Sequence, residues 1–113
     1  MANPWRDLAE KTLGPNDAVK KSYPCNFNKQ YGYLCLGKNK MVFVSEKGFL
    51  KKKYEVLLDA PYKEANVRIV DRFNIELVHK GETNRVETTG ISAKTLVKGI
   101  DDVRSFAQPT VTH

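Results

Sequence analysis

The sequence has little of what cross-linked scaffolds, membrane spans or secreted proteins require. It contains two cysteines, Cys25 and Cys35, which are too few to hold a small fold by disulfides. No apolar run approaches the ~18 residues that a membrane-spanning helix needs, and the first residues lack the apolar segment of a secretory signal. We therefore expect a cytoplasmic protein that is held together by an ordinary hydrophobic core.

Groups that carry catalytic chemistry are also scarce. The seven glycines are isolated turn residues, not a phosphate-binding loop, and the carboxylates form no recognisable acid–base pair. His79 stands beside a turn with no nucleophile motif to activate, so a surface histidine is the simpler interpretation. The spacing of the two cysteines matches no zinc pattern. We expect no catalytic residue, no cofactor and no metal site.

What the chain does have is the composition of one globular domain. Its 113 residues are 41% hydrophobic and 28% charged, which suits a single domain over residues 1–113 better than a disordered chain. The formal net charge of +6 favours anionic surfaces such as phosphate groups, acidic lipid headgroups or acidic proteins. Charge alone does not choose among them.

Helical patterns stand at both ends of the chain. Asn3 can cap a first helix over residues 4–13, Pro4 suits its first position, and Gly14 ends it. A second helix follows Ser92, and its buried positions form one stripe. The members of this stripe are Leu96, Val97, Ile100, Val103 and Phe106.

Two further features belong to the second helix. Gly99 weakens a helix by about 1 kcal/mol relative to alanine, so we expect a packing reason for it. Residues 107–113 are predicted to form a loose tail.

Between the helices, apolar and polar residues alternate in short segments that are separated by turns. The predicted strands cover residues 17–27, 31–36, 41–44, 53–58, 67–69, 73–77 and 85–89. Asp59, Ala60 and Pro61 are expected to interrupt the pattern, because proline removes a strand hydrogen bond. The fold class is therefore mainly β. We expect a seven-stranded antiparallel bent sheet, or partly open barrel, that the C-terminal helix caps.

Three segments of residues 16–106 together resemble a known family. The stretch 33–44 (YLCLGKNKMVFV) is similar to the second hairpin of pleckstrin-homology-like domains of the prokaryotic and GRAM type. The stretches 47–56 (KGFLKKKYEV) and 57–65 (LLDAPYKEA) resemble the basic turn and the connection that follow it in that family. The resemblance implies a bent seven-stranded sheet with a capping helix, and a role in binding phosphoinositides, peptides or other proteins.

The family's lipid-binding members carry a basic signature in their first hairpin. Here Tyr31, Gly32 and Tyr33 stand where its second basic pair would be, which counts against specific phosphoinositide recognition.

The densest basic cluster is Lys47, Lys51, Lys52 and Lys53, and Lys29 joins it as a second candidate for anion or partner binding. The alternative is a solvated edge that discourages sheet-to-sheet pairing. Four lysines near an acidic membrane contribute about 4 kcal/mol, which corresponds to roughly millimolar affinity. The lysines alone therefore could not hold the protein on a membrane.

Segments 33–36 and 41–44 are apolar on both faces, so they need two covers. One is the interior of the sheet, and the other is the N-terminal helix or a second subunit. If the helix packs elsewhere, an apolar interaction patch is expected. Its members would be Trp5, Tyr33, Leu34, Leu36 and Val42.

Cys25 and Cys35 face each other across the first hairpin if its turn centres on Gln30. They would then form either a redox-sensitive disulfide or two buried thiols, and a reducing compartment favours the thiols.

These features favour a non-catalytic binding or scaffold module with a protein partner and weak contact with acidic membranes. The alternative is a small basic nucleic-acid-binding barrel that uses Tyr31 and Tyr33 as stacking platforms. Monomer and homodimer both remain open.

Overall fold

The computed structural model describes residues 3–107, and of residues 105–107 it describes the backbone alone. The predicted tail, apart from the backbone of Ala107, and the side chain of Phe106 therefore lie outside the described residues. The elements are α1 (Pro4–Leu13), β1 (Lys21–Phe27), β2 (Gln30–Leu36), β3 (Lys40–Lys47), β4 (Lys53–Pro61), η1 (Tyr62–Glu64), β5 (Ala65–Asp71), β6 (Asn74–His79), β7 (Glu82–Thr88) and α2 (Ala93–Ala107).

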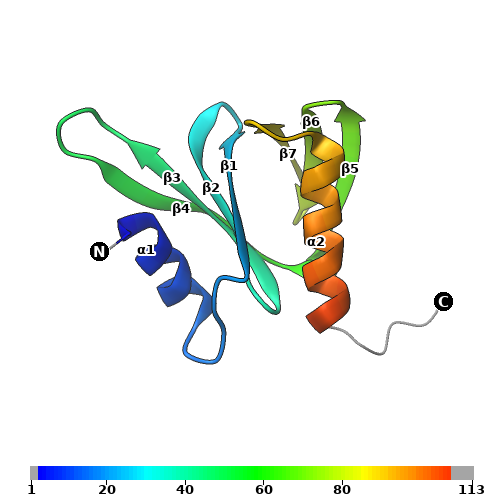
Figure 1. The fold of residues 1–113 in the computed structure, drawn as a ribbon, viewed down its shortest axis with the longest axis horizontal. Helices are drawn as coiled ribbons and strands as arrows, with labels where there is room; N and C mark the ends of the chain where they lie inside the picture. The colour runs from blue at the N-terminus through cyan, green and yellow to red at the C-terminus, as the bar shows by residue number, and fades with distance from the viewer. Residues whose placement is uncertain (1–2, 108–113) are drawn as a thin grey trace.

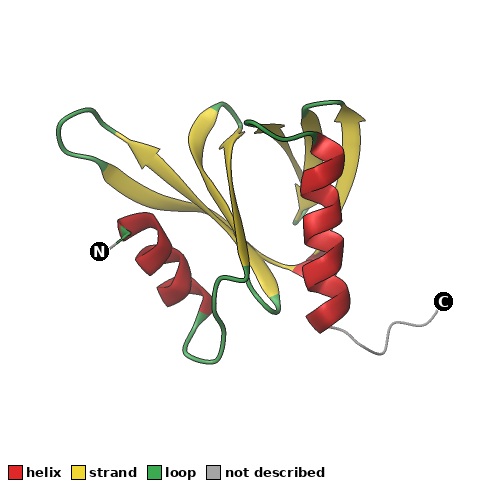
Figure 2. Cartoon of the chain, viewed as in Figure 1, coloured by secondary structure: helices red, strands yellow, loops and turns green. Residues whose placement is uncertain are grey.

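The seven strands form one antiparallel sheet in the order β4-β3-β2-β1-β7-β6-β5 (Figure 1). This confirms the predicted mainly β class with a helix at each end of the chain. The sheet is bent but not closed, so β4 and β5 are its two edges. Figure 2 shows the two helices on opposite flanks of the strands.

The turn between β1 and β2 consists of Asn28 and Lys29, which have φ values of 50° and 71°. Two consecutive positive φ values are typical of the mirror-image turns that fit the twist of a two-residue hairpin. This turn lies one to two residues before Gln30 and sets a different register from the predicted one. Cys25 is paired with Gly32, and Cys35 with Ser22. The predicted facing pair of cysteines is therefore wrong.

The main core lies between the sheet and α2, which crosses the open side of the bend (Figure 1). Its buried members are Cys25, Phe27, Leu34, Leu36, Met41, Phe43, Leu58, Ala60, Tyr62, Ala65, Ile75, Leu77, Val86, Ala93, Leu96, Ile100 and Val103. Ser92 caps α2 by accepting a hydrogen bond of 3.2 Å from the Thr95 N–H. Gly99 lies against the Tyr23 ring, where a methyl group would collide, and this is the expected packing reason.

The outer face of β2, β3 and β4 carries a second, smaller core. Its buried members are Ala9, Leu13, Val19, Cys35, Val42 and Val44. The helix α1 supplies the cover, and Trp5 stacks on Tyr33 with ring centroids 4.2 Å apart. Of the two predicted covers for this hairpin, the structure shows the intramolecular one.

Several strand ends differ from the predictions, and two of these differences have a clear local cause. Strand β4 continues through Pro61, because an edge strand tolerates proline. Strand β6 begins at Asn74, so Phe73 does not belong to the buried phase of that strand. The Asp71 carboxylate accepts hydrogen bonds from the Phe73 N–H (3.0 Å) and Asn74 Nδ2 (2.9 Å), which folds Arg72 and Phe73 into a turn.

Candidate functional site

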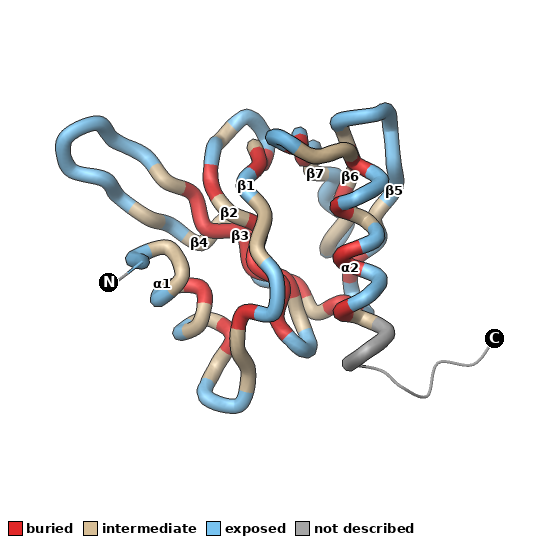
Figure 3. Tube along the Cα trace, in the orientation of Figure 1, coloured by how far each residue is buried: buried red, intermediate tan, exposed pale blue. Residues whose placement is uncertain are grey.

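The most exposed apolar side chains among the described residues are at the tip of the β3–β4 hairpin. Phe49 and Leu50 are each 90% exposed. The hairpin extends away from the rest of the sheet, and Figure 3 shows its outer half as a continuous exposed segment. We call residues 47–53 the tip.

Local geometry explains why these two side chains have no cover. Lys47 is paired with Lys53, so the loop has five residues where the β1–β2 and β6–β7 turns have two. Gly48 has a φ of 105°, and a side chain there would collide with the Lys51 carbonyl. The strand pairing therefore ends before Phe49 and Leu50, and no neighbouring strand packs on them.

The four predicted lysines come together around this apolar pair. The Lys52 Nζ lies 3.0 Å from the Glu46 Oε2, and this carboxylate raises the pKa of Lys52 above its ordinary value. Among the described residues, Lys47, Lys51 and Lys53 form no ion pair. Lys29 is not part of the tip, because it occupies the separate β1–β2 turn. The tip thus combines two large apolar side chains with three uncompensated positive charges.

An aromatic cluster lies at the base of the hairpin. The Tyr33 hydroxyl donates a hydrogen bond of 3.4 Å to Glu46, and the Tyr33 ring stacks on Trp5. Tyr31 contacts Tyr33 edge-on, with centroids 5.7 Å apart. Burial, followed by the neighbouring Tyr31, raises the pKa of Tyr33. Because Trp5 already covers one face of Tyr33, this ring is not an open platform for a nucleic-acid base.

The apolar interaction patch that the sequence suggested is not exposed in the structure. Leu34 and Leu36 are buried in the main core, while Val42 is buried beneath α1. Trp5 and Tyr33 are half-buried, and their rings stack on each other. An exposed patch of these five residues was therefore the wrong expectation, because α1 covers the outer face itself.

The two thiols lie in different cores on opposite faces of the sheet. Cys25 belongs to the main core and Cys35 to the core under α1. Burial raises the pKa of each from 9.0 to about 12. Since the thiolate is the reactive species, both groups are inert in the folded chain at neutral pH.

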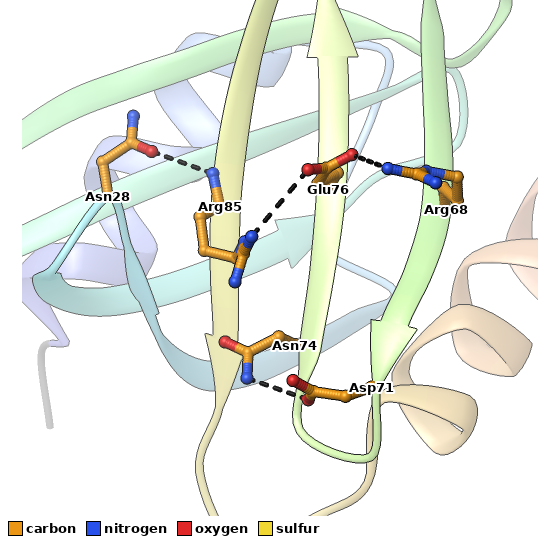
Figure 4. Close-up of polar contacts among 6 residues, drawn as sticks. All are labelled: Asn28, Arg68, Asp71, Asn74, Glu76 and Arg85. Carbon is orange, nitrogen blue, oxygen red and sulfur yellow. Dashed lines mark hydrogen bonds and ion pairs between the residues drawn. The ribbon is translucent and has the colours of Figure 1, made fainter.

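A charged ladder crosses the outer face of β5, β6 and β7 (Figure 4). Glu76 is bound by Arg68 on one side and lies 3.8 Å from Arg85 on the other. The hydrogen bond from Arg68 lowers the pKa of Glu76. Asn28 joins the ladder by accepting the Arg85 N–H at 2.9 Å. A lone carboxylate between two guanidinium groups suits cross-strand pairing better than acid–base chemistry.

His79 and the other potential metal ligands do not converge. The His79 Nε2 lies 3.9 Å from Glu64, at the end of β6. In the part of the chain that the structure describes, no three His, Cys, Asp or Glu side chains are placed to hold a metal ion.

No model of a known protein family matches the chain, and no curated protein matches its sequence. Among residues 3–107, no helix combines the length and the apolar character that crossing a membrane requires.

Sequence reasoning located the lysines of the tip but not Phe49 and Leu50. The signal was present: two large apolar residues stand between a turn glycine, Gly48, and three consecutive lysines. A position in a turn, outside any alternating pattern, is what distinguishes such a pair from core residues.

Proposed function

We propose that this chain is a non-catalytic binding module of the pleckstrin-homology-like type that docks on acidic membrane surfaces through the β3–β4 tip. The observation that carries the proposal is the 90% exposure of both Phe49 and Leu50 in a hairpin loop whose neighbouring residues include Lys47, Lys51, Lys52 and Lys53. Apolar side chains at a protruding tip can enter the interface of a bilayer, while the lysines remain at the level of anionic headgroups.

The expected binding free energy is larger when the apolar pair and the lysines both contact the membrane than when the lysines act alone. Lys47, Lys51 and Lys53 contribute about 3 kcal/mol near an acidic surface. Burying Phe49 and Leu50 adds about 1.5–3 kcal/mol for each side chain. Together these contributions reach roughly 6–9 kcal/mol, which corresponds to affinity in the micromolar range. The apolar pair therefore changes a negligible membrane affinity into a useful one.

A membrane fits the tip better than the two alternative partners. A protein partner would need a socket for a narrow, convex tip, whereas the bilayer interface accepts a protruding apolar side chain without matching its shape. The stacking platform expected for a nucleic acid needs free faces on both Tyr31 and Tyr33, and Trp5 covers one face of Tyr33. The experiment therefore tests membrane docking against two alternatives, a protein partner and a nucleic-acid partner.

The test is co-sedimentation with vesicles of phosphatidylcholine, with and without phosphatidylserine. The unaltered chain is expected to bind the acidic vesicles and to bind the neutral ones much more weakly. The double variant Phe49→Ser/Leu50→Ser should lose affinity by on the order of 100-fold, because its tip has no apolar area to bury.

A charge-matched pair of variants separates local contact from overall charge. Lys51→Gln/Lys53→Gln should weaken binding by ~30-fold, whereas Lys38→Gln/Lys63→Gln, which removes one exposed lysine from the β2–β3 turn and one from η1, should change it little. Failure to bind acidic vesicles, or equal losses in both charge variants, would overturn the proposal. Salt-sensitive retention on single-stranded RNA without vesicle binding would favour the nucleic-acid alternative.

A further inference from the structure

Three connections reach the same margin of the molecule. In Figure 1 the β3–β4 tip, the β1–β2 turn and the β5–β6 turn all end along the upper edge of the view. A membrane plane that lies along this margin, perpendicular to the view of Figure 1, would touch all three connections. The tip is therefore not the only part of the chain that a bilayer could contact.

The β5–β6 turn carries a second group of exposed apolar side chains. Phe73 is 47% exposed, Ile69 is 46% exposed and Val70 is 40% exposed. They are uncovered because β5 is an edge of the sheet and because Asp71 holds Phe73 in a turn outside β6. We call residues 69–73 the corner.

The charges around the corner are compatible with an acidic surface. The Arg72 guanidinium lies 5.4 Å from the centroid of the Phe73 ring. Arg72 and Lys94 line a hollow between the corner and the start of α2, together with Ile69, Asp71 and Ser92. Asp71 is an opposing charge, but its carboxylate accepts two hydrogen bonds within the turn. Glu87, which is paired with Asn74 on β7, is a second opposing charge and accepts a hydrogen bond of 3.5 Å from Asn26 Nδ2.

The β1–β2 turn supplies a positive charge between the two apolar groups. Lys29 is exposed there, and its neighbour Asn28 is neutral. Each end of the margin thus carries an apolar group with cations beside it. Lys29, in the β1–β2 turn, is a further cation between these two groups.

We propose that the chain lies on acidic bilayers along this whole margin, with the tip and the corner as two separate apolar contacts. The inference rests on the proposed function, and it adds a fixed orientation to it. With one contact the molecule could rotate about the tip, whereas two contacts restrict the orientation of the sheet relative to the membrane plane. The β2–β3 turn and the end of α2, at the lower edge of Figure 1, then face away from the membrane.

Tryptophan fluorescence can locate both contacts, because Trp5 is the single tryptophan of the chain. In a Trp5→Phe background, which keeps a ring against Tyr33, one tryptophan is placed at position 49, 73 or 16. Asn16 is exposed in the loop after α1 and serves as the control far from the margin. Each variant is titrated with phosphatidylserine vesicles that contain phosphatidylcholine brominated on its acyl chains.

Quenching at positions 49 and 73, with none at position 16, is the expected result. Quenching at position 49 alone would overturn the corner contact and leave the proposed function standing. Equal quenching at all three positions would overturn the fixed orientation. If none of the variants nor the unaltered chain binds vesicles, the proposed function fails and the inference fails with it.

A second measurement avoids the altered background. Ile69→Ser/Phe73→Ser in the otherwise unchanged chain should weaken binding to acidic vesicles by about 10-fold, less than the tip variant, because these side chains are already half-covered. An affinity equal to that of the unaltered chain would overturn the corner contact.

Discussion

Two of the apolar groups outside the main core differ in what covers them. Val42, Val44 and Cys35 on the outer face of the sheet are buried beneath α1. Phe49 and Leu50 at the tip of the next hairpin are almost fully exposed. Val42 and Val44 lie on β3, and Phe49 and Leu50 lie in the loop that follows it, so the difference comes from the cover and not from the hairpin.

This difference separates stability from binding. Residues under α1 leave water when the chain folds, so their apolar area contributes to the free energy of unfolding. Residues of the tip remain in water after folding, and their area is buried only when a partner arrives. Substitutions in the first group should therefore change stability, and substitutions in the second should change docking.

The largest expected effect comes from a charge placed beneath the cover. Val42→Asp puts a carboxylate into the buried apolar layer between the sheet and α1. We expect the free energy of unfolding to fall by about 4 kcal/mol, measured by urea denaturation. Leu50→Asp makes the same chemical change at the tip, and its unfolding curve should nearly overlay that of the unaltered chain. Equal losses in both variants would contradict the contrast between the groups.

Much of the fold follows from local patterns in the sequence. The alternation of Ile75 and Leu77, and the stripe that includes Leu96 and Ile100, predict their elements because each period matches one buried face. The register of β1 and β2 could not be predicted in the same way. It depends on positive φ values at Asn28 and Lys29, and lysine is an uncommon residue for such a turn.

The candidate site was predictable only in part. The lysines of the tip were found because they are adjacent in sequence. The role of Phe49 and Leu50 was missed, since apolarity alone does not say whether another element covers a side chain. The alternating pattern wrongly includes Phe73 in the strand, because the turn that holds Phe73 outside it depends on hydrogen bonds that the Asp71 carboxylate accepts, and periodicity does not report them.

A smaller effect is expected when the cover is loosened without a charge. Trp5→Ala removes the ring that stacks on Tyr33, and because Trp5 is only half-buried we expect a loss of about 2 kcal/mol in unfolding free energy. Burial holds the pKa of Cys35 near 12, so opening of α1 should lower it and expose the thiol. Labelling of Cys35 by a thiol reagent at mildly alkaline pH should then become faster.

Cys25 is the internal control for this measurement. It lies in the main core on the other face of the sheet, away from α1. In a Cys35→Ser chain, Trp5→Ala should leave the labelling rate of Cys25 almost unchanged. Parallel acceleration of both thiols would mean that the substitution opens the whole molecule and not the cover alone.

The smallest effect on stability should come from the tip. Phe49→Ser/Leu50→Ser removes side chains that are about as exposed in the folded chain as in the unfolded one, so folding transfers almost none of their area out of water. The free energy of unfolding should stay within about 0.5 kcal/mol of the unaltered value, measured by urea denaturation. A loss above about 1 kcal/mol would show that the tip packs against the chain, and an apolar pair engaged in that way would not be free to enter a bilayer. Unchanged stability with lost vesicle binding would instead assign the apolar area of the tip to docking.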